Sequence, residues 1–346
     1  MSGSSEINMA DVAERAGVST ATVSRALRDL PGVSEGTRQR IKEIADELAY
    51  VISPEASRLA RGATGRIAVV APRMDVWFYS KMLANIESVL SDADLDVLMY
   101  QVDGLQQRNR FFRDLPARRK VDAVVLIALP VLHDEVERLD LMGVEVVVAG
   151  GEIGTFPHVR VDDHAVGVTA IEHLLSLGHE RIAMLRTSDT DGAYWSADSE
   201  RSRGYRTALE AAGIRPDPRY LVTEPFGPRA GAAGMARLLA LESPPTAVFA
   251  YSDEVALGAY QHLLREGIRV PEEMSLVGVD GHPLAELFGL SSIVQAVGEQ
   301  GRLAGRMVLD LLAGVALPER HVVVPTRLEL RGSTAPPSAL TLARLD

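Results

Sequence analysis

Hydrophobic and polar residues follow two different patterns along this chain, and the change falls near residue 65. Before it, residues 9–50 carry apolar positions at helical spacing, interrupted by helix-end signals. Gly17 suits the position just after a helix, whereas Ser19 and Ser34 are favourable N-caps for the next two segments. The pattern therefore predicts three short helices in this region.

A short segment after these helices carries a further helix-start signal. Ser53–Glu55 offers an N-cap, a proline for the first helical position and an acid for the first turn. The helix that it opens is expected to end at Gly62. We therefore predict a domain at residues 1–52, joined to the rest of the chain by a hinge helix and linker at residues 53–65.

From Arg66 onward, strand patterns alternate with helical ones. RIAVVAP and VDAVVLIAL are continuous apolar runs, and amphipathic stretches of about 10–15 residues separate such runs. Parallel strands that are covered on both faces produce this pattern, so the fold class of the body is α/β with parallel sheets. Because about 265 residues exceed one comfortable hydrophobic core, two similar lobes are expected.

The amino-acid composition limits the kinds of site and the cellular location that are expected. The 346 residues include no cysteine, which excludes disulfides and thiolate metal sites. The N-terminal segment lacks the basic and apolar regions of a signal peptide, and no apolar run approaches the roughly 20 residues of a membrane span. We therefore expect a cytoplasmic protein with no membrane association.

Charge is unevenly distributed along the chain. The net charge is −11, yet residues 17–42 carry five basic and two acidic side chains, a local charge of +3. A DNA-binding protein needs a basic patch rather than a basic total, and acidity elsewhere keeps the remainder away from nucleic acid. The charge distribution therefore indicates the N-terminal helices as a DNA-binding surface.

The first two predicted helices and the glycine turn between them match a helix-turn-helix, whose second helix enters the major groove of DNA. Arginine bonds guanine bidentately there, and threonine or alanine methyl groups contact thymine. The residues expected to face bases are Thr20, Ala21 and Arg25. The hydroxyls expected to bind phosphates are those of Ser19, Thr22 and Ser24. By pattern alone, a helical bundle without DNA binding is an open alternative.

The stretch MADVAERAGVSTATVSRALRDLPGVSEGTRQRIKEIADELAY resembles the head of the LacI/GalR family of bacterial transcriptional regulators. The resemblance covers residues 7–334 and continues through SRLARG, RIAVVAP, VDDHAVGVTAIEHLLSLGHERIAML, RSRGYRTALEAAGI, TAVFAYSDEVALGAY, PEEMSLVGVDG and PTRLELRGST. It implies a homodimer on a palindromic operator in double-stranded DNA. It also implies that the hinge helix folds on DNA and wedges Leu59, flanked by Ala60, into the minor groove. Ile52 and Ser57 depart from the proline and arginine common in this part of the family.

The body resembles periplasmic sugar-binding proteins, which hold a ligand between two lobes. This likeness implies lobe 1 at about residues 66–163 and 292–324, lobe 2 at about residues 164–291 and 325–334, and a loose tail at residues 335–346. By position, Arg201 matches an arginine that reaches the ligand, and Asp280 matches an aspartate that accepts from ligand hydroxyls. The other effector-binding residues implied by position are Trp77, Phe78, Tyr79, Phe226 and Ser252.

Structural interpretations of the same residues stay open. Core or lobe packing also explains the aromatic side chains, and an ion pair with each other also explains Arg201 and Asp280. Asp162 and Asp163 are interpreted mainly as helix capping and bonding between lobes, and His179 as helix capping. Ser252 replaces an asparagine common in relatives, which removes an amide that both donates and accepts.

An α/β enzyme is the main rival class. No glycine-rich phosphate loop follows a strand and no G-x-S-x-G elbow is present. A periplasmic binding protein would carry a signal peptide and no helix-turn-helix. We therefore predict a homodimeric regulator, a repressor rather than an activator, controlled by a small molecule expected to be a sugar, with no catalytic residues, cofactor or metal. An activator, a corepressor-dependent regulator and a non-sugar effector are the alternatives.

Overall fold

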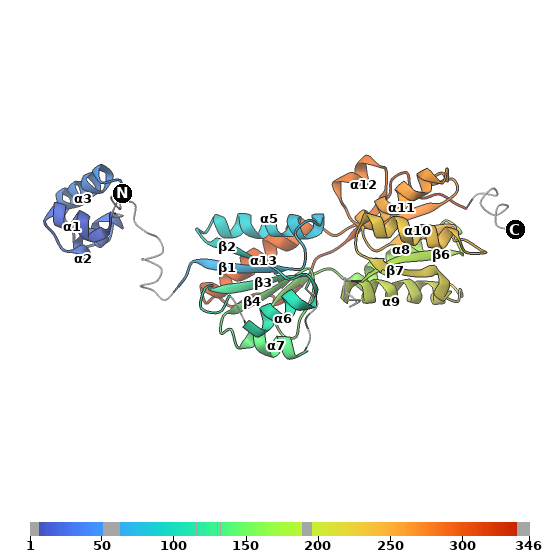
Figure 1. The fold of residues 1–346 in the computed structure, drawn as a ribbon, viewed down its shortest axis with the longest axis horizontal. Coiled ribbons are helices and arrows are strands. Elements are labelled where there is room, and N and C mark those ends of the chain that lie inside the picture. Colours follow the sequence, from blue (N-terminus) through green and yellow to red (C-terminus); the bar gives the residue numbers. More distant parts are fainter. Residues whose placement is uncertain are drawn as a thin grey trace. The chain divides into compact units, whose positions relative to one another are not determined.

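The computed structural model describes residues 7–50, 63–114, 117–129, 131, 133–188 and 196–337 (Figure 1). The chain divides into two compact units, residues 1–64 and residues 65–346, which we call the head and the body. No helix within the described ranges is long and apolar enough to cross a membrane.

The described part of the head contains three helices, α1 (Met9–Ala16), α2 (Thr20–Leu27) and α3 (Glu35–Glu47). The predicted caps are confirmed. Gly17 ends α1 in the left-handed region with a φ of 66°. The Ser19 side chain accepts from the Thr22 amide at the start of α2, and Ser34 caps α3 in the same way. The apolar faces of the helices enclose a small core around Ile41.

Lobe 1 of the body is built on a sheet in which six described strands run parallel in the order β11-β5-β4-β3-β1-β2. Helices α5 and α13 pack on one face, and α6 and α7 cover the other (Figure 1). The strands are β1 (Arg66–Ala71), β2 (Asp96–Gln101), β3 (Ala123–Ile127), β4 (Glu145–Ala149), β5 (His158–Arg160) and β11 (His321–Val323). The helices are α5 (Trp77–Ser91), α6 (Gly104–Asp114), α7 (His133–Asp140) and α13 (Val297–Leu312).

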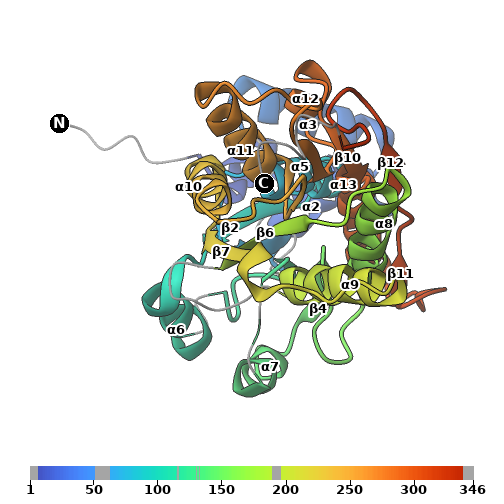
Figure 2. The same cartoon turned by 90° about the vertical axis from the view of Figure 1, so that its right-hand side faces the viewer.

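Lobe 2 repeats this plan with the described strands in the order β12-β10-β9-β8-β6-β7, parallel except between β10 and β12. Helices α8 and α9 lie on one face, and α10 and α11 on the other (Figure 2). The strands are β6 (Ile182–Ser188), β7 (Leu221–Pro225), β8 (Ala247–Ala250), β9 (Ser275–Asp280), β10 (Ser291–Val294) and β12 (Arg327–Glu329). The helices are α8 (Asp163–Ser176), α9 (Ser196–Ala211), α10 (Pro228–Leu239), α11 (Asp253–Arg265), α12 (Pro283–Leu287) and the 3-10 turn η1 (Pro218–Tyr220).

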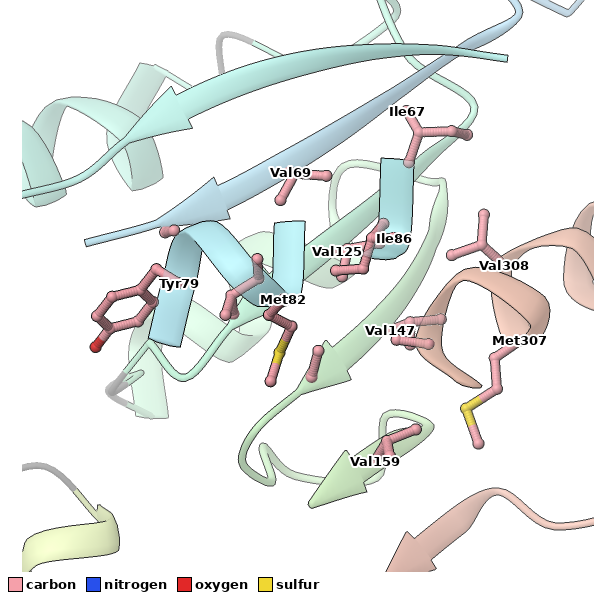
Figure 3. Close-up of a cluster of buried hydrophobic side chains, with 14 of the residues drawn as sticks. Ile67, Val69, Tyr79, Met82, Ile86, Val125, Val147, Val159, Met307 and Val308 are labelled. Carbon is pink, nitrogen blue, oxygen red and sulfur yellow. The ribbon is translucent and has the colours of Figure 1, made fainter. Parts of the chain in front are cut away.

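The central strands of lobe 1 are buried on both faces. All five residues of β3 are buried, and side chains of alternate parity enter different clusters on the two sides of the sheet. In one of these clusters, Val69, Val125 and Val147 meet Met82 and Ile86 of α5 (Figure 3). Because helices cover both faces, the strands are continuous apolar runs in the sequence rather than alternating ones.

The chain crosses back to lobe 1 later than predicted. The predicted return at residue 292 falls inside β10, which pairs in parallel with β9 of the second sheet. Ile293 of this strand is completely buried in the lobe 2 core, and this burial holds the segment in lobe 2. The chain leaves the second sheet only after Val294.

The tail predicted to be loose from residue 335 is held at its first residue. The carbonyl of Ala335 accepts from His179 Nε2 (2.9 Å), and its amide donates to Ser275 Oγ (3.0 Å). With Nε2 donating, Nδ1 of His179 lies 2.9 Å from the Thr246 hydroxyl, so this buried ring bonds across lobe 2 instead of only capping α8. Residues 338–346 of the predicted tail lie outside the described residues.

Candidate functional site

A pocket in the body is lined by residues of both lobes. Most of the lining residues lie at, or come shortly after, the carboxyl ends of β1, β3 and β4 in lobe 1 and of β8 and β9 in lobe 2. Ligand-binding groups of parallel sheets gather at this edge. The space between the walls, including solvent at the open mouth, is about 670 Å³. The lining residues are Arg73, Val76, Phe78, Tyr79, Ala128, Gly150, Asp163, Ser196, Ala197, Arg201, Phe226, Tyr251, Ser252, Asp280 and Gln295.

Arg201 is 3% exposed, projects from α9 into the pocket wall and is held by three interactions. Its Nε donates to Asp163 Oδ1 (2.8 Å), and a terminal nitrogen donates to the Tyr251 carbonyl (2.5 Å). Its guanidinium also lies 4.7 Å from the centre of the Tyr251 ring. The ion-pair partner of Arg201 is therefore Asp163, not Asp280, and this carboxylate together with the Tyr251 carbonyl fixes the plane of the guanidinium.

Asp280 ends β9 with a φ of 126°, which non-glycine residues rarely adopt. Its Oδ1 accepts from Gln295 Nε2 (2.5 Å) in the segment that returns to lobe 1. Burial and then the nearby Asp253 carboxylate raise the pKa of Asp280 well above its usual range, while Arg201 opposes the shift. A carboxyl group that is readily protonated both accepts and donates hydrogen bonds, which suits a hydroxylated ligand.

Asp253, in the first turn of α11, is completely buried and positions the loop after Asp280. Its Oδ2 accepts from the His282 amide (2.8 Å) and from the Ser292 hydroxyl (2.9 Å). Burial raises the pKa of Asp253 to about 7, against the lowering effect of these hydrogen bonds. The side chain therefore ties α11 to β10 and to the loop after β9, on which the geometry of Asp280 depends.

Aromatic rings form the apolar part of the pocket wall. Phe78 packs so closely on Gly150 that a side-chain carbon there would lie 2.9 Å from its ring, and Tyr79 is 8% exposed. Across the pocket, the Phe226 ring meets Tyr251 edge to face at 6.2 Å. The Arg73 guanidinium of lobe 1 lies 5.9 Å from the Phe226 ring of lobe 2, so this pair joins the two lobes.

Trp77, predicted as a pocket residue, does not line the pocket. Its ring lies 5.0 Å from the His282 ring of lobe 2, and its backbone amide donates to Glu254 Oε1 (3.4 Å). Because Val76 offers no side-chain cap, the carboxylate of Glu254 serves the start of α5 from the opposite lobe. Trp77 thus contributes to the contact between lobes.

Two further predicted residues cap helices, and one of them, Ser252, lines the pocket. Ser252 caps α11, because its hydroxyl accepts from the Val255 amide (3.3 Å). Asp162 caps α8 by accepting from the Ala165 amide (3.0 Å), which confirms the predicted cap. Asp163 was expected to bond between the lobes, but its partner Arg201 belongs to the same lobe.

The residues predicted to contact DNA lie mostly on the exposed surface of the head. Ser19, Thr20, Ala21 and Arg25 are exposed, whereas Thr22 and Ser24 are half-buried. The Ser19 and Thr22 hydroxyls bond each other (2.9 Å) at the start of α2. Leu59 and Ala60, the predicted minor-groove residues, lie outside the described residues, as does most of the predicted hinge.

Two of the five cations that were counted in the predicted positive patch at residues 17–42 have a structural role. Arg38 is mostly buried, donates to the carbonyls of Ala26 and Leu30, and pairs with Asp29. Lys42 binds the same Asp29 carboxylate (2.8 Å). These contacts fix the loop that follows α2, so the positive charge available at the surface comes more from the other arginines.

Two family profiles match the chain in the order of its two units: "Bacterial regulatory proteins, lacI family" at residues 8–53 and "Periplasmic binding protein-like domain" at residues 171–334. The HTH-type transcriptional repressor CytR of Escherichia coli K12 is 32% identical over 330 residues, which cover 94% of this chain and 96% of CytR. The chain belongs to the LacI family. The HTH-type transcriptional regulator DegA of Bacillus subtilis is 30% identical over 334 residues, 94% of this chain and 97% of DegA. This LacI-family chain is accordingly a DNA-binding transcriptional regulator and not an enzyme.

Solved structures of transcriptional regulators share the fold. The transcriptional regulator CelR in complex with cellobiose is 29% identical, with 95% of this chain and all of that chain covered and a TM-score of 0.70. A LacI family transcriptional regulator from Enterococcus faecium with bound ribose is 29% identical, with 79% and 100% covered and a TM-score of 0.70. The lac repressor dimer bound to operator and the anti-inducer ONPF has a TM-score of 0.84 at 23% identity, a likeness of fold.

Sequence reasoning missed several residues of the pocket in this LacI-family body. Tyr251 directly follows β8 and Arg73 comes two residues after β1, so the rule that strand ends gather at one sheet edge would have indicated both. Gln295 directly follows β10, which runs parallel to β9, so the same rule would have indicated it, and it bonds to Asp280. Of the predicted effector-binding residues, all except Trp77 line the pocket.

Proposed function

We propose that this LacI-family protein is a homodimeric repressor whose affinity for a palindromic operator is controlled by a sugar or similar polyhydroxylated molecule bound in the body pocket. The observation that carries the proposal is the pocket itself. Arg201 and Asp280, which lie far apart in the sequence, enter the walls of one cavity formed by both lobes. Ligand sites of two-lobed α/β proteins have this placement.

The chemistry of the walls suits a hydroxylated ring. Phe78 and Phe226 offer apolar faces to C–H groups, and the Asp280 carboxyl offers a hydrogen-bonding edge. A few placed polar groups among apolar walls fix the orientation of a small ligand. The cellobiose and ribose bound to two relatives of 29% identity support a sugar in this position.

Control of DNA binding follows from the position of the pocket between lobes. A ligand stabilises whichever arrangement of the lobes it fits better, and only this difference in affinity shifts the equilibrium. Contacts between the lobes, Arg73 with Phe226 and Trp77 with His282, change when the lobes move. We infer that such movement alters the spacing of the two heads of a dimer and thereby operator affinity.

The head is proposed to read DNA through α2. Its exposed residues Thr20, Ala21 and Arg25 are assigned to base edges in the major groove. Ser19, Thr22 and Ser24 are assigned to phosphates near the start of the helix. The proposed minor-groove contacts of Leu59 and Ala60 rest on the sequence alone.

An exposed apolar surface on lobe 2 supports the proposed homodimer. Leu284, Leu287 and Phe288 of α12 and the turn after it are exposed, and the Phe288 ring meets Tyr260 of α11 at 6.2 Å. Leu264, one helical turn after Tyr260, extends this surface at 56% exposure. Large exposed apolar patches mark interaction sites, and two-fold interfaces pair such a patch with its own copy. Sedimentation of Leu287→Glu is expected to show a monomer, and a wild-type monomer would exclude the dimer.

The ligand proposal is tested with Asp280→Asn and an exposed control, Asp140→Asn on α7. Thermal shift with a panel containing cellobiose and ribose identifies a ligand, and a duplex selected from a randomised pool supplies the operator. Asp280→Asn should bind this operator as wild type does without ligand. It should need about 2- to 12-fold more ligand for half of the response, since a hydrogen bond between neutral groups contributes about 0.5–1.5 kcal/mol.

The direction of the response separates the candidate mechanisms. Weaker operator binding with ligand indicates induction, whereas stronger binding indicates a corepressor. If Asp280→Asn responds at wild-type ligand concentrations, the pocket assignment is wrong. If no sugar of the panel changes melting temperature or operator affinity, the effector belongs to another class.

A further inference from the structure

A second basic region lies in lobe 1. Residues 108–120 contain six arginine or lysine side chains and one acid, in a chain of net charge −11. Arg108 is paired with Glu135, and Arg113 with Asp114. The remaining four cations are exposed: Arg110 on α6, and Arg118, Arg119 and Lys120 in the turn that precedes β3. We call the three turn residues the basic turn surface.

The turn itself keeps an arginine where the backbone favours glycine. The Lys120 amide donates to the Ala117 carbonyl (2.9 Å) and closes the turn. Arg119 has a φ of 60°, a left-handed conformation that strains residues with a Cβ atom. A long cation at such a position costs stability and gains nothing from burial, because its side chain is exposed. This combination indicates a functional reason for the charge.

The basic turn surface adjoins the residue at which the head is attached. Asp122, two residues after Lys120, accepts from the Gly65 amide (2.7 Å) through Oδ2. Its own amide donates to the Arg66 carbonyl (2.8 Å). Since the head ends at Thr64, these two bonds join the turn to the first residues of the body.

At the amino ends of the lobe 1 strands, the charge of the side chains differs on the two sides of β1. On the β3 side, the three cations Arg118, Arg119 and Lys120 outnumber the carboxylates of Asp122 and Glu145, whereas β2 on the other side begins with Asp96 and follows Asp92 and Asp94. The β3 side is therefore the side with a net positive charge, which attracts a polyanion. DNA is the polyanion that the head binds, and the planar fork of arginine matches phosphate oxygens.

We propose that the basic turn surface binds backbone phosphates of duplex DNA that flanks the operator sequence read by the head. The contact adds affinity without sequence preference, because phosphates carry no base information. Each neutralised phosphate releases counterions, so the contact also steepens the dependence of affinity on salt by about 0.9 per phosphate on a log–log scale. The inference depends on DNA binding by the head and not on the proposed effector.

The test compares two lengths of one duplex selected from a randomised pool: the recognised palindrome alone, and the palindrome with about two helical turns of flanking DNA on each side. Wild type should bind the longer duplex more tightly and with a steeper salt dependence. Arg118→Ser/Arg119→Ser/Lys120→Ser should bind the short duplex as wild type does. On the long duplex it should lose the gain, with a salt slope smaller by up to about 3 per chain.

A matched variant removes the same charge from lobe 2. Arg215, Arg229 and Arg265 are exposed, and their replacement by serine should leave the gain on the long duplex intact. Arg119→Gly separates binding from folding, because it relieves the positive φ. Its melting temperature should equal or exceed that of wild type, while the gain on the long duplex decreases.

Three results would overturn the proposal. Wild type shows no gain on the long duplex, the turn variant keeps the gain, or the lobe 2 variant loses it equally. Binding of a polyglutamate peptide that is lost in the turn variant, without any gain on the long duplex, would assign the surface to an acidic protein instead.

Discussion

The two lobes share one plan but bury different kinds of side chain. Among the described residues of lobe 1, Glu135, His158 and Gln300 are buried polar residues in a largely apolar interior. Lobe 2 buries many more: His179, Thr187, Asp198, Arg201, Ser202, Thr246, Ser252, Asp253, Ser275, Asp280, Ser291, Ser292 and Ser333. Buried polar groups need fixed partners, so lobe 2 is the lobe whose polar geometry is set in advance.

The pocket walls reflect the same difference. Lobe 1 contributes mainly Val76, Phe78, Tyr79, Ala128 and Gly150, with Arg73 as the one charged side chain among these described lining residues. Lobe 2 contributes the carboxylates, the second arginine and most of the hydroxyls. Under the proposed function, lobe 2 sets which ligand is accepted, and lobe 1 supplies an apolar cover that excludes water.

The largest expected effect is a loss of stability on changing the polar interior of lobe 2. Arg201→Ala leaves the Asp163 carboxylate, whose side chain is 14% exposed, without its ion-pair partner, and frees the Tyr251 carbonyl. Removing one member of a buried ion pair costs about 3–5 kcal/mol of unfolding free energy. Urea unfolding measures this loss. The double variant with Asp163→Ala should lose less than the sum of the two single variants, and strict additivity would refute the coupling.

An intermediate effect concerns pH and Asp253. Its folded pKa of about 7 exceeds the unfolded value of about 3.9, so the folded state holds a proton that the unfolded state releases between these values. The contribution of Asp253 to the free energy of unfolding is fully present below about pH 4 and is lost as the pH rises through 7. Relative to Asp253→Asn, wild type should therefore become less stable from pH 5 to pH 8. The change is at most about 1.4 kcal/mol per pH unit.

The control for this pH series is Asp140→Asn, which changes an exposed carboxylate of lobe 1. Its stability difference from wild type should stay constant over the same range. A constant difference for Asp253→Asn as well would show that the buried carboxyl is ionised throughout.

The smallest expected effect concerns the contact between the lobes. Trp77→Ala removes the ring that lies 5.0 Å from His282, and aromatic pairs of this kind contribute about 0.5–1.5 kcal/mol. The ligand concentration for half of the operator response should therefore shift by about 2- to 12-fold. Trp77→Phe should restore most of the wild-type response. Identical titration curves for wild type and Trp77→Ala would mean that the contact does not affect the lobe equilibrium.

Local signals in the sequence were sufficient to predict the helices of the head and the central strands of the body. Gly17, Ser19 and Ser34 bound the helices of the head as predicted, because caps depend on nearby backbone groups. The continuous apolar runs of the body became central parallel strands, since burial on both faces leaves no polar alternation. The resemblance to the LacI family also placed Arg201 and Asp280 in one pocket.

The orientation and partners of the site residues came from the tertiary structure. Trp77 and Phe78 are neighbours in the sequence, yet on α5 they point to different surroundings, and only Phe78 lines the pocket. Arg201 pairs with Asp163 rather than with Asp280, which was the alternative ion-pair partner considered from the sequence. Adjacent helical residues diverge by about 100°, so sequence proximity does not determine a shared environment.

The sequence by itself determined the family, the order of head and body, and the types of element, because these depend on local caps, periodicity and motifs. The tertiary structure decided which charges are paired, where lobe 2 ends, and that Ala335 is held by His179. It also placed the basic turn beside Gly65 through Asp122, across 57 residues of sequence. Such contacts join distant segments through packing and hydrogen-bond geometry, and no local pattern in the chain encodes them.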